Sequence, residues 1–63
     1  MQPHQQRVVE EQNELQLKCD RLTTFMMGEI FQGLSQHERD LLATQLILMR
    51  QYSDVLVERM KAF

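Results

Sequence analysis

The chain has few of the features that usually stabilise a small domain. Its 63 residues include one cysteine, one proline, two glycines and no tryptophan. The single cysteine, Cys19, excludes an intrachain disulfide and is typical of a reducing compartment. Only His4 and His37 accompany it as soft metal ligands, at spacings that fit no familiar zinc site, so we expect no metal. A chain this short usually needs some other stabilising partner, which leaves association with further copies.

Long apolar runs and an excess of positive charge are also missing. No run reaches about 18 apolar residues and the first residues lack the apolar core of a signal peptide, so we expect a cytoplasmic protein without membrane contact. Seven basic and nine acidic residues give a net charge of −2. This balance argues against binding to DNA or RNA polymers, but a local basic cluster can still hold a small anion.

Catalytic motifs are absent as well. There is no glycine-rich phosphate loop, no metal-binding motif and no acidic pair with an obvious cleft. His4 and Cys19 are too far apart for a dyad, because fifteen helical residues span about 22 Å. A short hairpin also has little interior in which to shift a pKa. We therefore expect a binding protein, with no enzymatic activity and no cofactor.

The sequence does contain a strong helical pattern in its first part. Pro3 suits the first turn of a helix, and apolar residues then recur at helical spacing. This stripe comprises Val8, Leu15, Cys19, Leu22 and Met26. Gln12 is its one polar member, and a polar residue at such a position can set the register of packing. The pattern predicts a helix over about 3–27, with Gly28 as its C-cap.

A second helix follows after a short connection. Ser35 and Glu38 match a capping box, in which the serine caps the helix and the glutamate bonds back to the serine N–H. No glycine or proline follows Gly33, which we expect to free the backbone before this cap. The pattern predicts a helix over about 36–61.

The connection over 28–35 is unusually apolar for a turn. We expect its GEIF segment to form one extra helical turn that folds Ile30 and Phe31 under the end of the molecule. Because short connections join antiparallel neighbours, the predicted fold is all-α: a single domain over 1–63, built as an antiparallel two-helix hairpin.

The second helix has more apolar surface than one neighbour covers. One face carries Leu42, Leu46, Met49, Leu56 and Met60. A second face, about 90° round the helix, carries Leu41, Leu48, Tyr52 and Val55. One partner helix covers a stripe little wider than about 100°, and chains with larger exposed apolar patches associate. We therefore predict a homo-oligomeric helical bundle that uses the second face as its interface.

A polar stripe lies beside the apolar stripe of the first helix. Its members follow at alternating steps of three and four: His4, Arg7, Glu11, Glu14, Lys18, Arg21 and Phe25. Such a stripe is commonly a solvated face with ion pairs between residues i and i+4. Its start is also basic, and a helix N-terminus offers free N–H groups to a phosphate. The antiparallel helix brings Tyr52, Arg59 and Lys61 toward the same end.

Together these groups suit a nucleotide. A ring stacks on a base, guanidinium groups bind phosphates, and glutamine amides read base edges. The candidate ligand-binding residues are His4, Arg7, Lys18, Tyr52 and Arg59. Interface packing, with the hydroxyl at the rim, is the alternative role for Tyr52. For Thr23 and Thr24 we expect hydroxyls that bond back to helix carbonyls.

The pattern HQQRVVEE, then IFQGLS, then YS, VL and RM resembles small helical proteins of bacteriophages and prophages, over residues 4–63. Its architecture is similar to that of phage anti-CBASS and anti-Thoeris sponges. These oligomeric hairpins hold cyclic nucleotide immune signals between subunits. In the anti-CBASS sponges an aromatic residue precedes the first helix and a lysine follows about two heptads later. Lys18 matches that lysine, whereas Pro3 stands in place of the aromatic residue.

The resemblance implies an anti-defence protein that acts in the cytoplasm of a bacterial host. It would sequester a cyclic nucleotide in pockets between subunits, without catalysis. The alternative is an oligomeric interaction or adaptor protein whose apolar face docks onto a host or phage protein.

Overall fold

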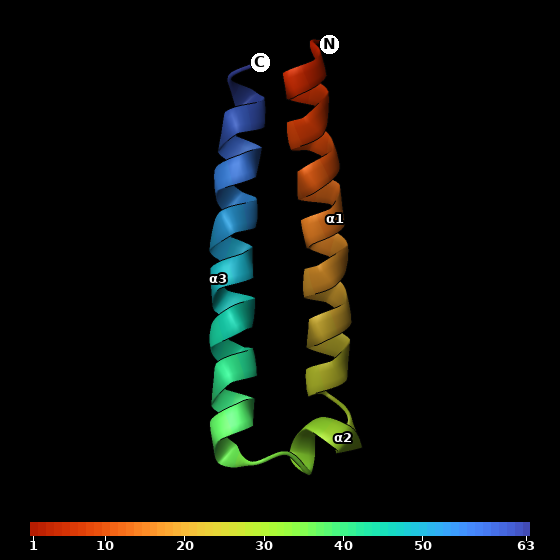
Figure 1. The fold of residues 1–63 in the computed structure, drawn as a ribbon, viewed down its shortest axis with the longest axis vertical. Helices are drawn as coiled ribbons and strands as arrows, with labels where there is room; N and C mark the ends of the chain where they lie inside the picture. Colours follow the sequence, from red (N-terminus) through yellow and green to blue (C-terminus); the bar gives the residue numbers. More distant parts are fainter.

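The computed structural model describes residues 1–63 and is entirely helical. Helix α1 spans Pro3–Met26, α2 spans Glu29–Gln32 and α3 spans Gln36–Lys61. Figure 1 shows α1 and α3 side by side, with both termini at one end and α2 at the other. The all-α hairpin with a helical turn in its connection is confirmed. None of the helices combines the length and the apolar character that crossing a bilayer requires.

The passage from α1 to α2 corrects one prediction. The C-cap of α1 is Met27, at φ −87 and ψ −7, in the ordinary helical region. Gly28 is instead the N-cap of α2, with φ −96 and ψ 173. No residue of the chain has a positive φ. The prediction that Gly28 caps α1 is therefore wrong, because the chain enters α2 without the left-handed residue that such a cap needs.

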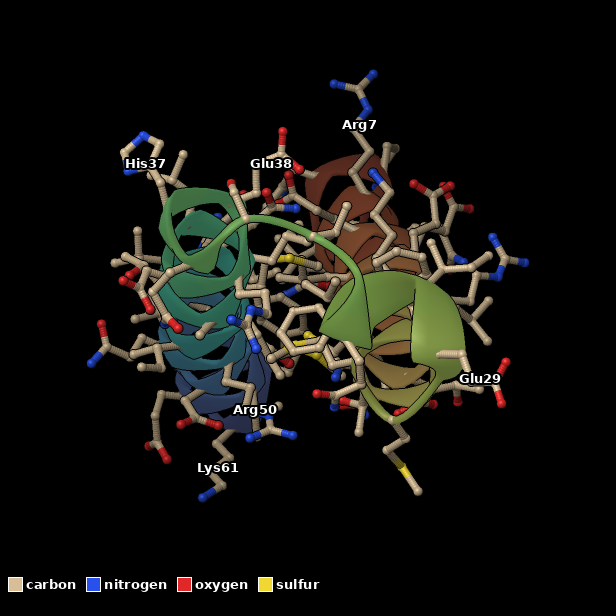
Figure 2. All side chains as sticks on the ribbon, turned by 90° about the horizontal axis from the view of Figure 1, so that it is seen from below. Arg7, Glu29, His37, Glu38, Arg50 and Lys61 are labelled. Carbon is tan, nitrogen blue, oxygen red and sulfur yellow. The ribbon has the colours of Figure 1, made fainter.

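The apolar residues of the connection pack differently from the prediction. The ring of Phe31 meets that of Phe25 edge to face, with centroids 6.3 Å apart. Seen from below in Figure 2, α2 covers the end of α1 and leaves α3 uncovered. Ile30 is 72% exposed. Phe31 therefore extends the packing of α1, and the prediction that Ile30 folds under the end of the hairpin is wrong.

The start of α3 uses a serine cap. The Oγ of Ser35 accepts a hydrogen bond from the N–H of Glu38 at 3.2 Å. This is the first half of the predicted capping box. The second half is not formed, and the Glu38 carboxylate extends away from the hairpin (Figure 2).

The core is a narrow seam between α1 and α3. Its buried apolar side chains are Val8, Leu15, Cys19, Leu46 and Leu56. Leu56 is completely buried, and Met49 and Met60 pack beside it. These residues come from the two apolar stripes predicted to face each other, which confirms the rotation of both helices about their axes.

A polar contact lies within this seam. The Nε2 of Gln12 donates to the Oγ of Ser53 at 3.2 Å, and Ser53 is buried. A shift of either helix along its axis would separate these two groups and leave the buried Ser53 hydroxyl without this partner. The contact fits the predicted role of Gln12 in setting register.

Replacing Leu56 with alanine is expected to remove much of the stability of the hairpin. Emptying a buried leucine site lowers the free energy of unfolding by about 2–5 kcal/mol. Ile47→Ala is the matched control on the same helix, since Ile47 is 56% exposed, and it should change stability by about 0.5 kcal/mol or less. Urea unfolding followed by far-UV circular dichroism measures both variants. Equal losses would contradict the placement of the core.

Gly33→Ala is expected to stabilise the protein, contrary to a special role for this glycine. Gly33 has φ −82 and ψ −8, and an added Cβ would lie 3.5 Å from its nearest neighbour, the carbonyl oxygen of Ile30. Because alanine fits there and restricts the unfolded chain, the free energy of unfolding should rise by about 0.4–1 kcal/mol. Gly28→Ala is the control without a gain, since alanine is a poorer N-cap than glycine. A destabilised Gly33→Ala variant would show that the turn is tighter than described.

Candidate functional site

The hairpin has two broad faces, one on each side of the plane that contains α1 and α3. In the end-on view of Figure 2, Arg7, His37 and Glu38 extend to one side, while Arg50 and Lys61 extend to the other. We name the first the Tyr52 face and the second the Arg50 face. The faces differ in chemistry: the Tyr52 face joins an exposed apolar surface to charged groups, and the Arg50 face has a polar cleft.

The contact that defines the Tyr52 face joins the two helices. A hydrogen bond with the Glu11 carboxylate raises the pKa of Tyr52 above 10.0, desolvation and the negative charge of Glu11 add to this, and the positive charge of Arg59 opposes it. The neutral phenol, which is the form that can donate to Glu11, is thereby favoured over the phenolate. The contact also places Glu11 of α1 against Tyr52 of α3, with Arg59 close by.

The remaining candidate ligand residues lie on this face by helical register. Arg7 is one turn before Glu11, His4 is two turns before it, and Lys18 is two turns after it. All three side chains are exposed. The five predicted ligand residues thus share one side of the hairpin. They do not meet at one point, because the fourteen residues from His4 to Lys18 span about 21 Å of helix.

The ionic contacts differ from those expected. Neither Arg7 with Glu11 nor Glu14 with Lys18 forms an ion pair, and the one ion pair in the structure joins Lys61 to Glu58 at 3.0 Å. Lys61 therefore points to the Arg50 face and does not add its charge to the basic end of α1 (Figure 2). The positive charges of Arg7 and Lys18 remain unpaired within the chain.

A shallow apolar groove runs along α3 on the Tyr52 face. It has a volume of about 520 Å³ and is lined by Leu41, Thr44, Gln45, Leu48, Met49 and Tyr52. The side chains of Leu41, Leu48 and Val55 are 55–58% exposed, and that of Tyr52 is 45% exposed. The second apolar face predicted for α3 is thus uncovered in the single chain.

The Arg50 face has a smaller polar cleft, which the sequence patterns did not reveal. Its volume is about 240 Å³, and its lining is Gln16, Cys19, Asp20, Thr23, Arg50, Ser53 and Asp54. The Nη2 of Arg50 donates to the Oγ1 of Thr23 at 3.4 Å across the helices. These residues come from the edges of the two apolar stripes, one on each helix, so only the mutual rotation of the helices brings them together.

The hydroxyls near the end of α1 are already satisfied. The Oγ1 of Thr23 donates to the carbonyl of Cys19 at 2.8 Å, and that of Thr24 donates to the carbonyl of Asp20 at 3.0 Å. The prediction that both hydroxyls bond back to the helix is confirmed. Cys19 is buried as a free thiol, and no group of three or more histidine, cysteine, aspartate and glutamate side chains is placed to hold a metal ion.

Comparison with known proteins relates the chain to phage proteins. A family model with the description Sequestin matches residues 2–62. A relative from Enterobacteria phage T4, described as an uncharacterized 7.5 kDa protein in the denB-rIIB intergenic region, is 36% identical over all 63 residues of the chain and 98% of its own length. No solved structure matches. The predicted resemblance to small phage proteins is confirmed.

The contact between Tyr52 and Glu11 has a direct spectroscopic test, because Tyr52 is the only tyrosine and the chain has no tryptophan. Glu11→Gln is expected to lower the pKa of Tyr52 toward 10.0, since the amide lacks the charge that disfavours a phenolate. Titration of the phenolate absorbance measures this shift. Glu10→Gln, with the same chemical change at the exposed neighbouring position, should leave the pKa as it is. An unaltered pKa in Glu11→Gln would show that Glu11 does not contact Tyr52.

The raised pKa of Tyr52 makes the stability of the folded protein depend on pH. Because the neutral phenol is favoured in the folded state, this contact contributes its full stability below the unfolded pKa near 10.0. The contribution is lost as the pH rises through the raised pKa of the folded protein.

Proposed function

The chain belongs to the Sequestin family, and from this membership we propose that it acts by holding a ligand, without chemical change. The ligand that we propose is a cyclic nucleotide used by infected bacteria as an immune signal. Inhibition then results from a lower concentration of free signal. The family name and the phage relative support a phage protein that sequesters a ligand. The chemistry of the Tyr52 face supports the choice of ligand class.

The observation that carries this proposal is the combination of an exposed ring with unpaired cations on one face. Tyr52 presents an aromatic surface, and Arg59 lies close enough to influence its pKa. The cations Arg7 and Lys18 follow along α1 on the same side, with the imidazole of His4 at the start of the helix. A base stacks on such a ring, and phosphates take charge-assisted hydrogen bonds from guanidinium and ammonium groups.

A pocket on this face needs a second copy of the chain. The groove beside Tyr52 is shallow, and the candidate cations are spread along much of α1. The exposed Leu41, Leu48 and Val55 lie next to the ring, and their burial against another copy would exclude water from both sides of a ligand. We therefore place the binding pockets between subunits of a homo-oligomer.

Arg7→Ala is expected to weaken nucleotide binding while the assembly persists. Loss of a charge-assisted hydrogen bond of about 1.5–3 kcal/mol raises the dissociation constant roughly tenfold to a hundredfold. Calorimetry against cyclic di- and trinucleotides and cyclic ADP-ribose isomers measures binding, and light scattering measures mass. Lys61→Ala is the matched control, since it removes a cation from the Arg50 face. Leu48→Glu should abolish the assembly, and with it the binding.

Two results would overturn the proposal. An absence of binding across the whole nucleotide panel would remove the proposed ligand class. Full binding by Arg7→Ala would remove the Tyr52 face as the site. An exposed apolar groove also suits docking onto a host or phage protein, and that adaptor function predicts insensitivity to Arg7→Ala together with strong sensitivity to Leu48→Glu.

A further inference from the structure

The Tyr52 face of α3 carries a complete heptad pattern that the core does not use. The residues follow at alternating steps of three and four: Glu38, Leu41, Gln45, Leu48, Tyr52, Val55 and Arg59. This spacing is the seam along which one helix packs against another in a coiled coil. The contact with α1 uses a different stripe, centred on the buried Leu46 and Leu56. We name the unused pattern the outer seam.

We propose that the outer seam pairs with the outer seam of a second copy, antiparallel, about a two-fold axis at Leu48. This inference rests on the proposed function and specifies the subunit contact that its pockets require. Leu48 then meets the partner's Leu48, and Leu41 meets the partner's Val55. At the two ends, Glu38 meets the partner's Arg59. A two-fold interface uses the same patch on both copies, so the leucine–valine contact and the charged contact are each made twice, while Leu48 meets its equivalent once, on the axis.

The charges at the ends of the outer seam decide the orientation. In a parallel pair, Glu38 would face the partner's Glu38 and Arg59 would face the partner's Arg59. The antiparallel pair replaces both repulsions with attractions, the usual means by which charged positions select helix orientation. Both side chains are available for this contact, because the structure pairs only Lys61 with Glu58. Glu38 also extends outward on the Tyr52 face (Figure 2).

The dimensions of the hairpin agree with a contact between whole faces. The molecule measures 45 × 15 × 13 Å. Its broad face therefore projects about 700 Å², close to the roughly 800 Å² that each partner commonly buries in a stable complex. The exposed leucines and valine of the outer seam span about 21 Å of helix, so the apolar contact would occupy the centre and the charged pairs the rim.

Charge exchange tests the pairing. The wild-type protein should have a mass of at least twice 7.6 kDa by light scattering. Glu38→Arg and Arg59→Glu should each weaken the assembly at least about tenfold, because each creates like-charge contacts. The double variant that carries both changes should restore it. Lys61→Glu, which makes the same change of charge at the same end of α3 but on the Arg50 face, should leave the mass unaltered.

Disulfide trapping tests the orientation, in a Cys19→Ala background. Leu48→Cys should form a disulfide with itself across the axis, because such a bond needs α-carbons within about 7 Å. Leu41→Cys should not react with itself, but should form a disulfide with a Val55→Cys chain. A larger assembly with this same pattern also supports the outer seam. A monomeric wild type, single charge changes without effect on mass, or a disulfide formed by Leu41→Cys alone would overturn it.

These results separate the interface from the ligand. The double charge exchange restores assembly but leaves no guanidinium at position 59, so nucleotide binding should stay impaired in calorimetry. A protein that passes the mass and disulfide tests yet binds no nucleotide keeps the outer seam and loses the proposed ligand. A monomer that binds a nucleotide keeps the proposed ligand and loses the outer seam.

Discussion

Two helices can form only one seam between them, and every other property of this protein depends on how that seam is filled. Val8 and Leu15 of α1 meet Leu56 of α3, which is fully buried. The remaining apolar face of α3 has no helix to cover it. A chain of this size buries only about 60% of the surface that its unfolded state exposes, so a second copy that covers this face, as we propose, would add to its stability. The same uncovered face provides the surface on which a function can be built.

The polar contact within the seam links stability to the distribution of charge. With Gln12 bonded to Ser53, their neighbours Glu11 and Tyr52 emerge together on one face. Asp54, which follows Ser53, lines the cleft on the other face, where Arg50 reaches Thr23. If either helix were rotated about its axis, residues of the Tyr52 face and of the Arg50 face would lie on the same side of the hairpin. The separation into an aromatic, charged face and a polar, self-satisfied face is therefore a consequence of packing in the core.

This separation gives the Sequestin fold a simple route to a binding site. A single hairpin offers a ring, an apolar groove and unpaired cations, but no enclosure. In the assembly that we propose, pairing two such faces would convert an exposed groove into a crevice between copies, where charge-assisted hydrogen bonds are stronger because water is excluded. Glu38 and Arg59, at the two ends of the outer seam, carry opposite charges and would orient the partner in the assembly that we propose.

The sequence by itself determined the helices, their bounds and the stripes along them, because the helical period, the proline in the first turn of α1 and the Ser35 cap of α3 are local properties. It did not determine the route of the connection, where Ile30 turns outward and Gly28 begins α2, since this depends on how Phe31 meets Phe25. Nor did it place Lys61 on the Arg50 face or bring Arg50 to Thr23. Those outcomes belong to the tertiary structure, because periodicity gives each residue an angle about its own helix, while only packing sets the rotation of one helix against the other.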